Sequence, residues 1–154
     1  VTLLYDVARP EQKKAMGRDV LTDFSALRGK KILLCDDHEL NREITKFMLE
    51  SKDMSVICAA NGQEAVQYYV ESDEGEFAAI LMDIRMPVMD GLQATMKIRS
   101  YARRDSKIIP IIALTANALD EEENVCLEAG MNARLTKPID PHQIYSTLLE
   151  YINH

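Results

Sequence analysis

A fivefold alternation of short apolar runs and amphipathic stretches, from about residue 30 onward, is the feature that most constrains the fold. The runs are strand-sized and apolar throughout, which indicates strands that are covered on both faces of a sheet. The stretches between them carry apolar residues at helical spacing. The predicted strands span 31–35, 54–60, 77–82, 108–114 and 133–136, and the predicted helices span 39–50, 61–69, 91–101, 120–129 and 140–152.

Regular alternation of strand and helix favours a parallel sheet with right-handed crossover connections. Five units are too few for an eight-unit barrel, so the sequence predicts an open, doubly wound α/β sheet with helices on both faces. Ligands of such sheets bind at the carboxyl ends of the strands. The residues that follow each predicted strand are therefore the candidates for a functional site.

The first part of the chain lacks this alternation and has a different charge. Residues 1–29 hold five basic and four acidic side chains and have a net charge of +1. Because the whole chain has a net charge of −7, residues 30–154 carry −8. A length of 154 residues suits one domain with a short flank. We therefore predict that residues 1–29 are a linker or the flank of a preceding domain, and that residues 30–154 form the patterned domain.

Composition disfavours several classes of function. The chain has 18 basic and 25 acidic side chains, so no basic surplus favours direct binding to nucleic acid. No apolar run approaches the ~18 residues needed to span a bilayer, and no membrane contact is expected of this fragment. Cys35, Cys58 and Cys126 are too few and too scattered for a disulfide framework or a zinc cluster, which favours a reducing, cytoplasmic setting.

Charged and hydroxyl side chains stand at the predicted strand ends. Asp36 and Asp37 follow the first strand, Asp83 the third and Thr115 the fourth, and Lys137 follows the fifth. Three carboxylates at one sheet edge repel one another unless a cation neutralises them, and hard oxygen ligands favour Mg²⁺. A hydroxyl and an ammonium group can hold the oxygens of a phosphoryl group. The sequence predicts a Mg²⁺-dependent site in which Asp83 is the carboxylate nucleophile that accepts phosphate.

These residues lie in motifs that resemble the receiver domain of two-component response regulators, over roughly residues 30–153. The motifs are Ile32-Leu-Leu-Cys-Asp-Asp37, Leu81-Met-Asp-Ile-Arg-Met-Pro87 with Asp90-Gly91, Ile111-Ile-Ala-Leu-Thr-Ala116, and Lys137-Pro138. Each motif is weak alone, but together, in this order and each at a strand end, they are specific. The resemblance implies the flavodoxin-like strand order 2-1-3-4-5.

The resemblance also implies a role for each site residue. Asp83 would be the phosphoacceptor and would contact Mg²⁺, and Asp37 would be a direct metal ligand. Asp36 would act partly through water, and the backbone carbonyl of Arg85 would complete the protein's share of the metal shell. Thr115 and Lys137 would contact the phosphoryl oxygens. The fragment itself would catalyse at most its own dephosphorylation.

A finer resemblance is to the receivers of hybrid sensor histidine kinases. It rests on Leu27-Arg-Gly-Lys-Lys-Ile-Leu-Leu33, Asn41, Leu114-Thr-Ala-Asn117 and Gly130-Met-Asn132 through Lys137-Pro-Ile139. It implies that the receiver takes phosphate from a kinase histidine and passes it to a histidine phosphotransfer protein. The parent chain would then be a histidine kinase, cytoplasmic at this domain even where that kinase is anchored in a membrane.

Three alternatives stay open from the residues. The domain could be a degenerate receiver that acts as a protein-binding module, or the receiver of a transcriptional regulator. A phosphatase that forms an aspartyl-phosphate would resemble an Asp-x-Asp sequence, whereas Arg85 stands where the second carboxylate would be. The chain also departs from the family pattern at Arg134, where an aromatic residue or histidine usually takes part in switching.

Overall fold

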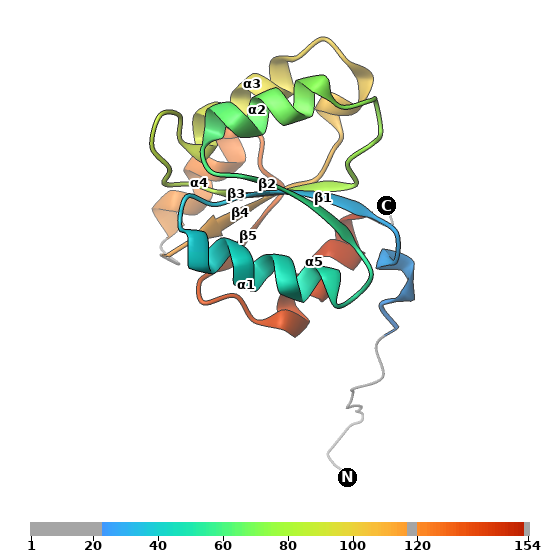
Figure 1. Ribbon diagram of the computed structural model, residues 1–154. Helices are drawn as coiled ribbons and strands as arrows, with labels where there is room; N and C mark the ends of the chain where they lie inside the picture. Colours follow the sequence, from blue (N-terminus) through green and yellow to red (C-terminus); the bar gives the residue numbers. More distant parts are fainter. Residues whose placement is uncertain (1–22, 117–119, 153–154) are drawn as a thin grey trace.

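The computed structural model describes residues 23–116 and 120–152, and for residues 120–123 it describes the backbone alone. The chain forms one five-stranded parallel sheet of order β2-β1-β3-β4-β5, which confirms the predicted doubly wound fold (Figure 1). The strands are β1 (Lys31–Cys35), β2 (Ser55–Ala59), β3 (Ala79–Asp83), β4 (Ile111–Thr115) and β5 (Ala133–Thr136). Residues 1–22 of the predicted flank, Asn117 and residues 153–154 lie outside the described residues.

Five α-helices cover the sheet, with α1 and α5 on one face and α2, α3 and α4 on the other (Figure 1). They are α1 (Glu39–Glu50), α2 (Gly62–Glu71), α3 (Gly91–Ser100), α4 (Asp120–Ala129) and α5 (Pro141–Ile152), with short 3₁₀ helices η1 (Ser25–Leu27) and η2 (Arg104–Lys107). β4 begins later than predicted, because the Ile108 and Ile109 amides donate to the Asp105 carbonyl in a turn that follows η2.

Local sequence signals set several helix ends. The Asn61 side chain accepts a hydrogen bond of 2.9 Å from the Glu64 amide, as the predicted capping box requires. The Glu64 carboxylate reaches back one residue further than predicted and accepts from the Ala60 amide at 2.9 Å. Gly130 has a φ of +107° and ends α4, because a residue in this left-handed region stops the helix without a Cβ clash.

Two apolar clusters hold the helices to the sheet, one on each face. Alternate residues of β1, β3 and β4 contribute to each cluster, since successive side chains of a strand point to opposite faces. All residues of β3 and β4 are buried, which accounts for their continuous apolar sequences. This double coverage fixes the strand register and therefore the relative positions of the residues that follow the strands.

Most of the apolar residues that predicted α1 face solvent. Leu40, Ile44, Phe47 and Met48 have the helical spacing of an amphipathic helix, yet the first three are exposed, and Met48 alone of the four packs on the cluster of the α1 and α5 face. The helix contacts the sheet instead through the stripe that includes Thr45 and Leu49, which are buried. Helical spacing reveals that apolar residues share one side of the helix, but it does not state which side meets the sheet.

Part of the predicted N-terminal flank packs on this domain. Leu27 is fully buried in the cluster on the α1 and α5 face. Phe24 lies with its ring centroid 5.4 Å from that of Tyr145 and 5.6 Å from that of His142. η1 precedes β1, so the chain enters at the amino ends of the strands. The boundary near Gly29 stays a prediction.

A polar network ties together two connections at the amino ends of the strands. The Asp105 carboxylate is buried and accepts hydrogen bonds from the Tyr69 hydroxyl at 2.8 Å, Arg103 Nε at 2.7 Å and the Gly75 amide at 2.9 Å. Burial alone would raise the pKa of Asp105, but these hydrogen bonds together hold it below its ordinary value. Burial and the bond to Asp105 raise the pKa of Tyr69 to about 12.

Candidate functional site

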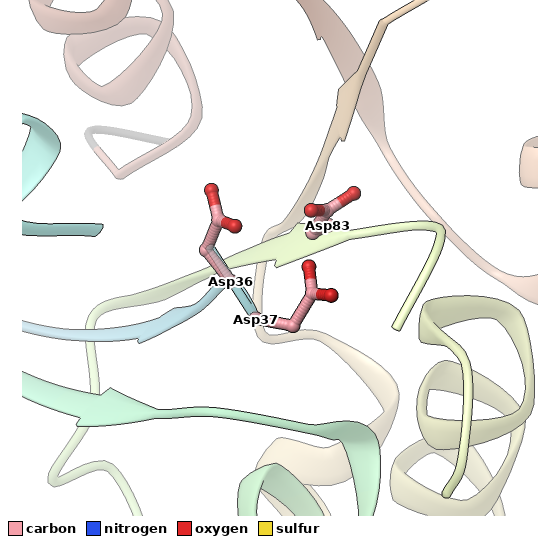
Figure 2. A group of neighbouring side chains, drawn as sticks. All are labelled: Asp36, Asp37 and Asp83. Atoms are coloured by element: carbon pink, nitrogen blue, oxygen red, sulfur yellow. The ribbon is translucent and has the colours of Figure 1, made fainter. Parts of the chain in front are cut away.

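Three carboxylates meet at the carboxyl ends of β1 and β3 (Figure 2). Asp36, Asp37 and Asp83 each place one oxygen within 4.8 Å of the others. Asp36 and Asp83 are buried, with exposed fractions of 1% and 6%, whereas Asp37 is exposed. The structure therefore brings together the three aspartates that the sequence placed at neighbouring strand ends.

Backbone amides orient the two buried carboxylates. The His38 amide donates to Asp36 Oδ1 at 2.9 Å, and the Arg85 amide donates to Asp83 Oδ1 at 3.2 Å. Each bond joins a residue to the second residue after it, which is the usual way that aspartate stabilises the turn leaving a strand. His38 also caps α1, since its Nδ1 accepts from the Asn41 amide at 3.4 Å. The sequence did not predict this capping role of His38.

Lys137 joins the cluster from the loop after β5. Its Nζ lies 2.9 Å from Asp83 Oδ2 and 3.1 Å from Asp36 Oδ2, so one ammonium group bridges both buried carboxylates. The Lys137 amide donates to the Thr115 carbonyl at 2.7 Å, which fixes the start of this loop beside the end of β4. The predicted convergence of the lysine with the aspartates is present.

Negative charge exceeds positive charge among Asp36, Asp37, Asp83 and Lys137. Burial raises the pKa of Asp83, the hydrogen bond from Lys137 opposes that rise, and the nearby Asp36 adds to it. Burial would lower the pKa of Lys137, but its bonds to Asp83 and its proximity to Asp36 raise it instead. Three carboxylates face the ammonium group of Lys137, so the cluster favours a further cation.

The donor set fits a divalent cation with hard-ligand preferences. Carboxylate oxygens are the ligands that Mg²⁺ prefers, and oxygens on opposite sides of that ion lie about 4 Å apart. Adjacent oxygens on an octahedral ion lie only about 2.9 Å apart, so the aspartate oxygens, which lie within 4.8 Å of one another, would have to move closer together or act through water. The exposed position of Asp37 leaves one side of the cluster open for water or a phosphoryl oxygen.

The other predicted site residues take different positions. Thr115 is buried at the last position of β4, and in the register of the sheet Leu114 lies opposite Asp83. Arg85 is exposed in the loop after β3. Arg134 is half-buried on β5, opposite Ala113 of β4.

An open cleft of about 720 Å³ lies beside the acidic cluster, and sequence reasoning missed it. Its lining joins Asp37 to the loop between β3 and α3 and to α4. The lining residues are Asp37, Ile84, Arg85, Met86, Pro87, Asp90, Leu92, Val125 and Cys126. The sequence offered two signals for it in the connection after the third strand, the pairs Met86-Pro87 and Asp90-Gly91.

This combination defines a class of protein: a doubly wound α/β domain with an acidic, lysine-bridged site at the carboxyl edge of its sheet. The family model of the response regulator receiver domain matches residues 32–149. The chain belongs to this family, as its motifs predicted.

Relatives of known description are histidine kinases. The chain is 35% identical over 126 residues to hybrid signal transduction histidine kinase I of Dictyostelium discoideum, and the match covers 80% of the chain. It is 36% identical over 139 residues to the sensor protein GacS of Pseudomonas syringae pv. syringae, with 90% of the chain covered. These matches span only 7% and 15% of the two relatives' own lengths.

Solved structures agree with the fold and the family. The receiver domain of the sensor histidine kinase PA1611 from Pseudomonas aeruginosa PAO1 has a TM-score of 0.74 and 40% identity, with 82% of this chain and 99% of that chain covered. That structure has a magnesium ion coordinated in its active site cleft. A second similar structure is a co-crystal from Saccharomyces cerevisiae, which contains the histidine phosphotransfer signalling protein Ypd1 and the receiver domain of its downstream response regulator Ssk1. The matching chain has a TM-score of 0.70 and 28% identity, with 80% of this chain and 89% of that chain covered.

Within residues 23–116 and 120–152, no helix combines the length and the apolar character that crossing a bilayer requires.

Proposed function

We propose that this receiver domain accepts a phosphoryl group on Asp83 from a histidine of a histidine kinase, with Mg²⁺ bound, and passes it to a histidine phosphotransfer protein. One observation carries the proposal. Lys137 Nζ bridges Asp83 and Asp36 at 2.9 and 3.1 Å, at the edge where Asp37 leaves the cluster open. In this proposal the buried Asp83 is the nucleophile, Lys137 supplies a fixed positive charge, and the aspartates form the cation-binding group.

The transfer conserves atoms and charge. A carboxylate oxygen of Asp83 forms a bond to phosphorus as the phosphorus–nitrogen bond of phosphohistidine breaks, and the imidazole leaves. The product is an acyl phosphate on Asp83. Passing the group on reverses these roles, because the acyl–oxygen to phosphorus bond then breaks as a new histidine nitrogen attacks.

The side chains around Asp83 have separate tasks in this proposal. Lys137 keeps its ammonium group against the developing charge of the phosphoryl oxygens, and its raised pKa means that it stays protonated at neutral pH. The Thr115 hydroxyl, at the end of the adjacent strand, donates a hydrogen bond to one phosphoryl oxygen. Burial of Asp83 limits the water that could hydrolyse the product.

Asp36, Asp37, Asp83 and the backbone carbonyl of Arg85 would hold the magnesium ion. Bound there, Mg²⁺ would neutralise charge on the carboxylates and on the phosphoryl oxygens. The magnesium in the related PA1611 receiver supports this assignment, as does the excess of negative charge in the cluster. Asp37, the exposed carboxylate of the set, would contact the ion directly, and Asp36 would act partly through water.

The exposed side of α1 supports the proposal that the partner is a histidine phosphotransfer protein. Leu40, Ile44 and Phe47 form an apolar stripe on α1, a helix that begins just after the acidic pair. A small apolar patch bordered by charged groups suits a transient interface. The likeness to a structure that contains Ypd1 with a receiver gives this partner independent support. We place the domain in the cytoplasm, where a kinase would supply the phosphoryl group.

The experiment incubates the protein with Mg²⁺ and acetyl phosphate and follows its intact mass. We expect a labile gain of one phosphate in the wild type and none in Asp83→Asn, since an amide is a poor nucleophile. Asp53→Asn is the matched control: it makes the same change at an exposed carboxylate near the amino end of β2 and should leave phosphate uptake unchanged. Substantial uptake by Asp83→Asn would reject the assignment.

The same measurement separates two of the alternatives. A degenerate receiver would gain no mass, and a phosphatase would consume acetyl phosphate without accumulating the phosphorylated form. A receiver of a transcriptional regulator would gain the same mass, so it is separated by the parent gene, which would continue into a DNA-binding domain.

A further inference from the structure

Arg42, in the second turn of α1, donates a hydrogen bond to the turn that follows β1. Its Nη1 lies 2.7 Å from the backbone carbonyl oxygen of Asp36. A hydrogen bond from a charged donor is roughly twice as strong as one between neutral groups. The Asp36 carbonyl belongs to the peptide group that joins Asp36 to Asp37. The bond therefore holds the stretch of backbone that carries two of the three clustered carboxylates.

Other contacts hold Asp36 on its own side of this peptide group. The Asp36 amide donates to the Ala59 carbonyl at 3.1 Å, and the Asp36 side chain accepts from the His38 amide at 2.9 Å. Asp37 differs, because its side chain is exposed and takes its position from the backbone. Figure 2 shows the two side chains leaving successive backbone positions. The orientation of the peptide group, which Arg42 fixes, therefore decides where the Asp37 carboxylate reaches.

The inward side of α1 gives Arg42 a fixed base. Arg42, Thr45 and Leu49 are separated by three and four positions, so they lie on the same side of the helix. Thr45 and Leu49 are buried, and Arg42 is half-buried. The Arg42 amide also donates to the His38 carbonyl at 2.9 Å. A guanidinium anchored in this way is suited to hold a neighbouring peptide group in one orientation.

We propose that Arg42 is a positioning residue for the magnesium ion: through the Asp36 carbonyl it holds Asp37 where the carboxylate of Asp37 contacts the ion. This inference rests on the proposed function, in which Asp37 is the direct ligand. The aspartate oxygens lie within 4.8 Å of one another and have to come closer or act through water when the ion binds. A fixed peptide group confines this change to side chains. Without Arg42, the backbone would also have to be ordered during binding, at a cost in conformational entropy.

The positive charge of Arg42 acts in the opposite direction. A guanidinium near the acidic cluster repels a divalent cation, so removal of the charge alone would strengthen Mg²⁺ binding by about two- to fourfold. Loss of a group that orients a metal ligand weakens metal binding by about tenfold or more. The net effect of removing Arg42 should therefore be a weakening of Mg²⁺ binding by about three- to tenfold. The sign of the change distinguishes a positioning role from a purely electrostatic one.

The test titrates the wild type, Arg42→Met and Arg42→Lys with magnesium chloride and follows the amide resonances of Asp37 and Arg85 by NMR. Arg42→Met keeps an unbranched side chain but has neither a donor nor a charge, and its Kd for Mg²⁺ should rise by about three- to tenfold. Arg42→Lys keeps a charged donor, and its Kd should stay within about twofold of the wild-type value. The titration reports on folded protein without phosphate, so it does not depend on activity.

Two controls separate position from charge and from stability. Lys46→Met removes a positive charge one turn further along α1, and its Kd for Mg²⁺ should equal the wild-type value or fall below it. Arg103→Met removes a similar bond, from Arg103 Nη1 to the Ser72 carbonyl at 2.6 Å, near the amino ends of the strands. It should lower the melting temperature without changing the Kd for Mg²⁺. If either control weakened Mg²⁺ binding as much as Arg42→Met, the specific role of Arg42 would be excluded.

Phosphate uptake gives a second readout. At saturating Mg²⁺, Arg42→Met should take up phosphate from acetyl phosphate within about twofold of the wild-type rate, because the ion then restores the order that Arg42 supplied. The Mg²⁺ concentration for half-maximal rate should rise by the same factor as the Kd. A loss of rate that excess Mg²⁺ does not restore would overturn the positioning role, since Arg42 would then act on the transfer itself.

The remaining outcomes separate this inference from the proposed function. Unchanged or tighter Mg²⁺ binding by Arg42→Met would overturn the inference and leave the proposed function standing. Equal weakening in Arg42→Lys and Arg42→Met would overturn the role of the hydrogen bond. Wild-type protein that binds Mg²⁺ but takes up no phosphate would reject the proposed function, while the Mg²⁺ affinities would still decide the role of Arg42. Wild-type protein whose resonances do not respond to Mg²⁺ would overturn both.

Discussion

Leu27→Ala tests how far the folded domain extends into the predicted flank. Leu27 is fully buried in the cluster on the α1 and α5 face, although it precedes the boundary that charge and periodicity placed near Gly29. Its neighbours in that cluster include Ile32 of β1 and Leu148 of α5. Truncation to alanine removes these contacts and leaves a cavity, because the strands and α5 cannot close over it completely.

The magnitude follows from the burial. A fully buried leucine replaced by alanine costs about 2–5 kcal/mol of unfolding free energy, and about 3 kcal/mol is a central value. A domain of about 130 residues unfolds with an entropy near 0.27 kcal/mol per kelvin. The melting temperature should therefore fall by about 11 °C.

Differential scanning calorimetry at pH 7 measures this change directly. Leu40→Ala is the matched control, since Leu40 is largely exposed on α1 and its truncation should shift the melting temperature by less than about 2 °C. Equal melting temperatures for wild type and Leu27→Ala would refute the reasoning and would mean that the flank is detached in solution.

Three further predictions concern the metal, pH and switching. Mg²⁺ should bind in the millimolar range and raise the melting temperature of the wild type in a thermal shift assay. Asp37→Ala should lose most of that rise. Identical responses of the two proteins to Mg²⁺ would exclude Asp37 as a direct ligand. Asp105→Asn should cost about 2 kcal/mol at pH 7 in urea unfolding, because charge-assisted bonds to the carboxylate are lost. The folded-state pKa of Asp105 lies below its ordinary value of 3.8, so the stabilisation is complete above that pH and disappears as the pH falls through the folded-state pKa. The free energies of unfolding of the two proteins should therefore converge in strong acid. A difference that stays constant with pH would contradict the lowered pKa. Beryllofluoride, a phosphoryl mimic, should shift the amide resonances of α4 less in the wild type than in Arg134→Tyr, because moving a charged guanidinium into an apolar pocket beside Thr115 is costly. Large shifts across α4 of the wild type would contradict this.

The site was predictable because of the topology. Parallel strands bring their carboxyl ends to one edge, so residues as distant in sequence as Asp36 and Lys137 had to converge once the alternation was recognised. The helices with clear caps also followed, since the Asn61 side chain and Gly130 mark helix ends by local chemistry.

Other features depend on tertiary contacts that no local pattern encodes. The spacing of Leu40 and Ile44 predicts a helix, but the competition between two stripes for the sheet decides which is buried. Leu27 lies in a segment without periodicity, and only the space between β1 and α5 explains its burial. Val88, in the loop between β3 and α3, has a left-handed conformation with a φ of +68°, which results from hydrogen bonds that its neighbours make in the loop and with α2, and valine itself disfavours it.

The bridge from Lys137 to Asp83 also has a consequence for protein synthesis. The two residues are 54 positions apart, so a ribosome adding about 5–20 residues per second needs about 3–11 s between them. During that interval the nascent chain carries its acidic residues without their lysine and without β5. If Asp83 accepts phosphate as proposed, a kinase that meets the unfinished polypeptide would find no competent acceptor, and loading with phosphate would begin only after the last strand has joined the sheet.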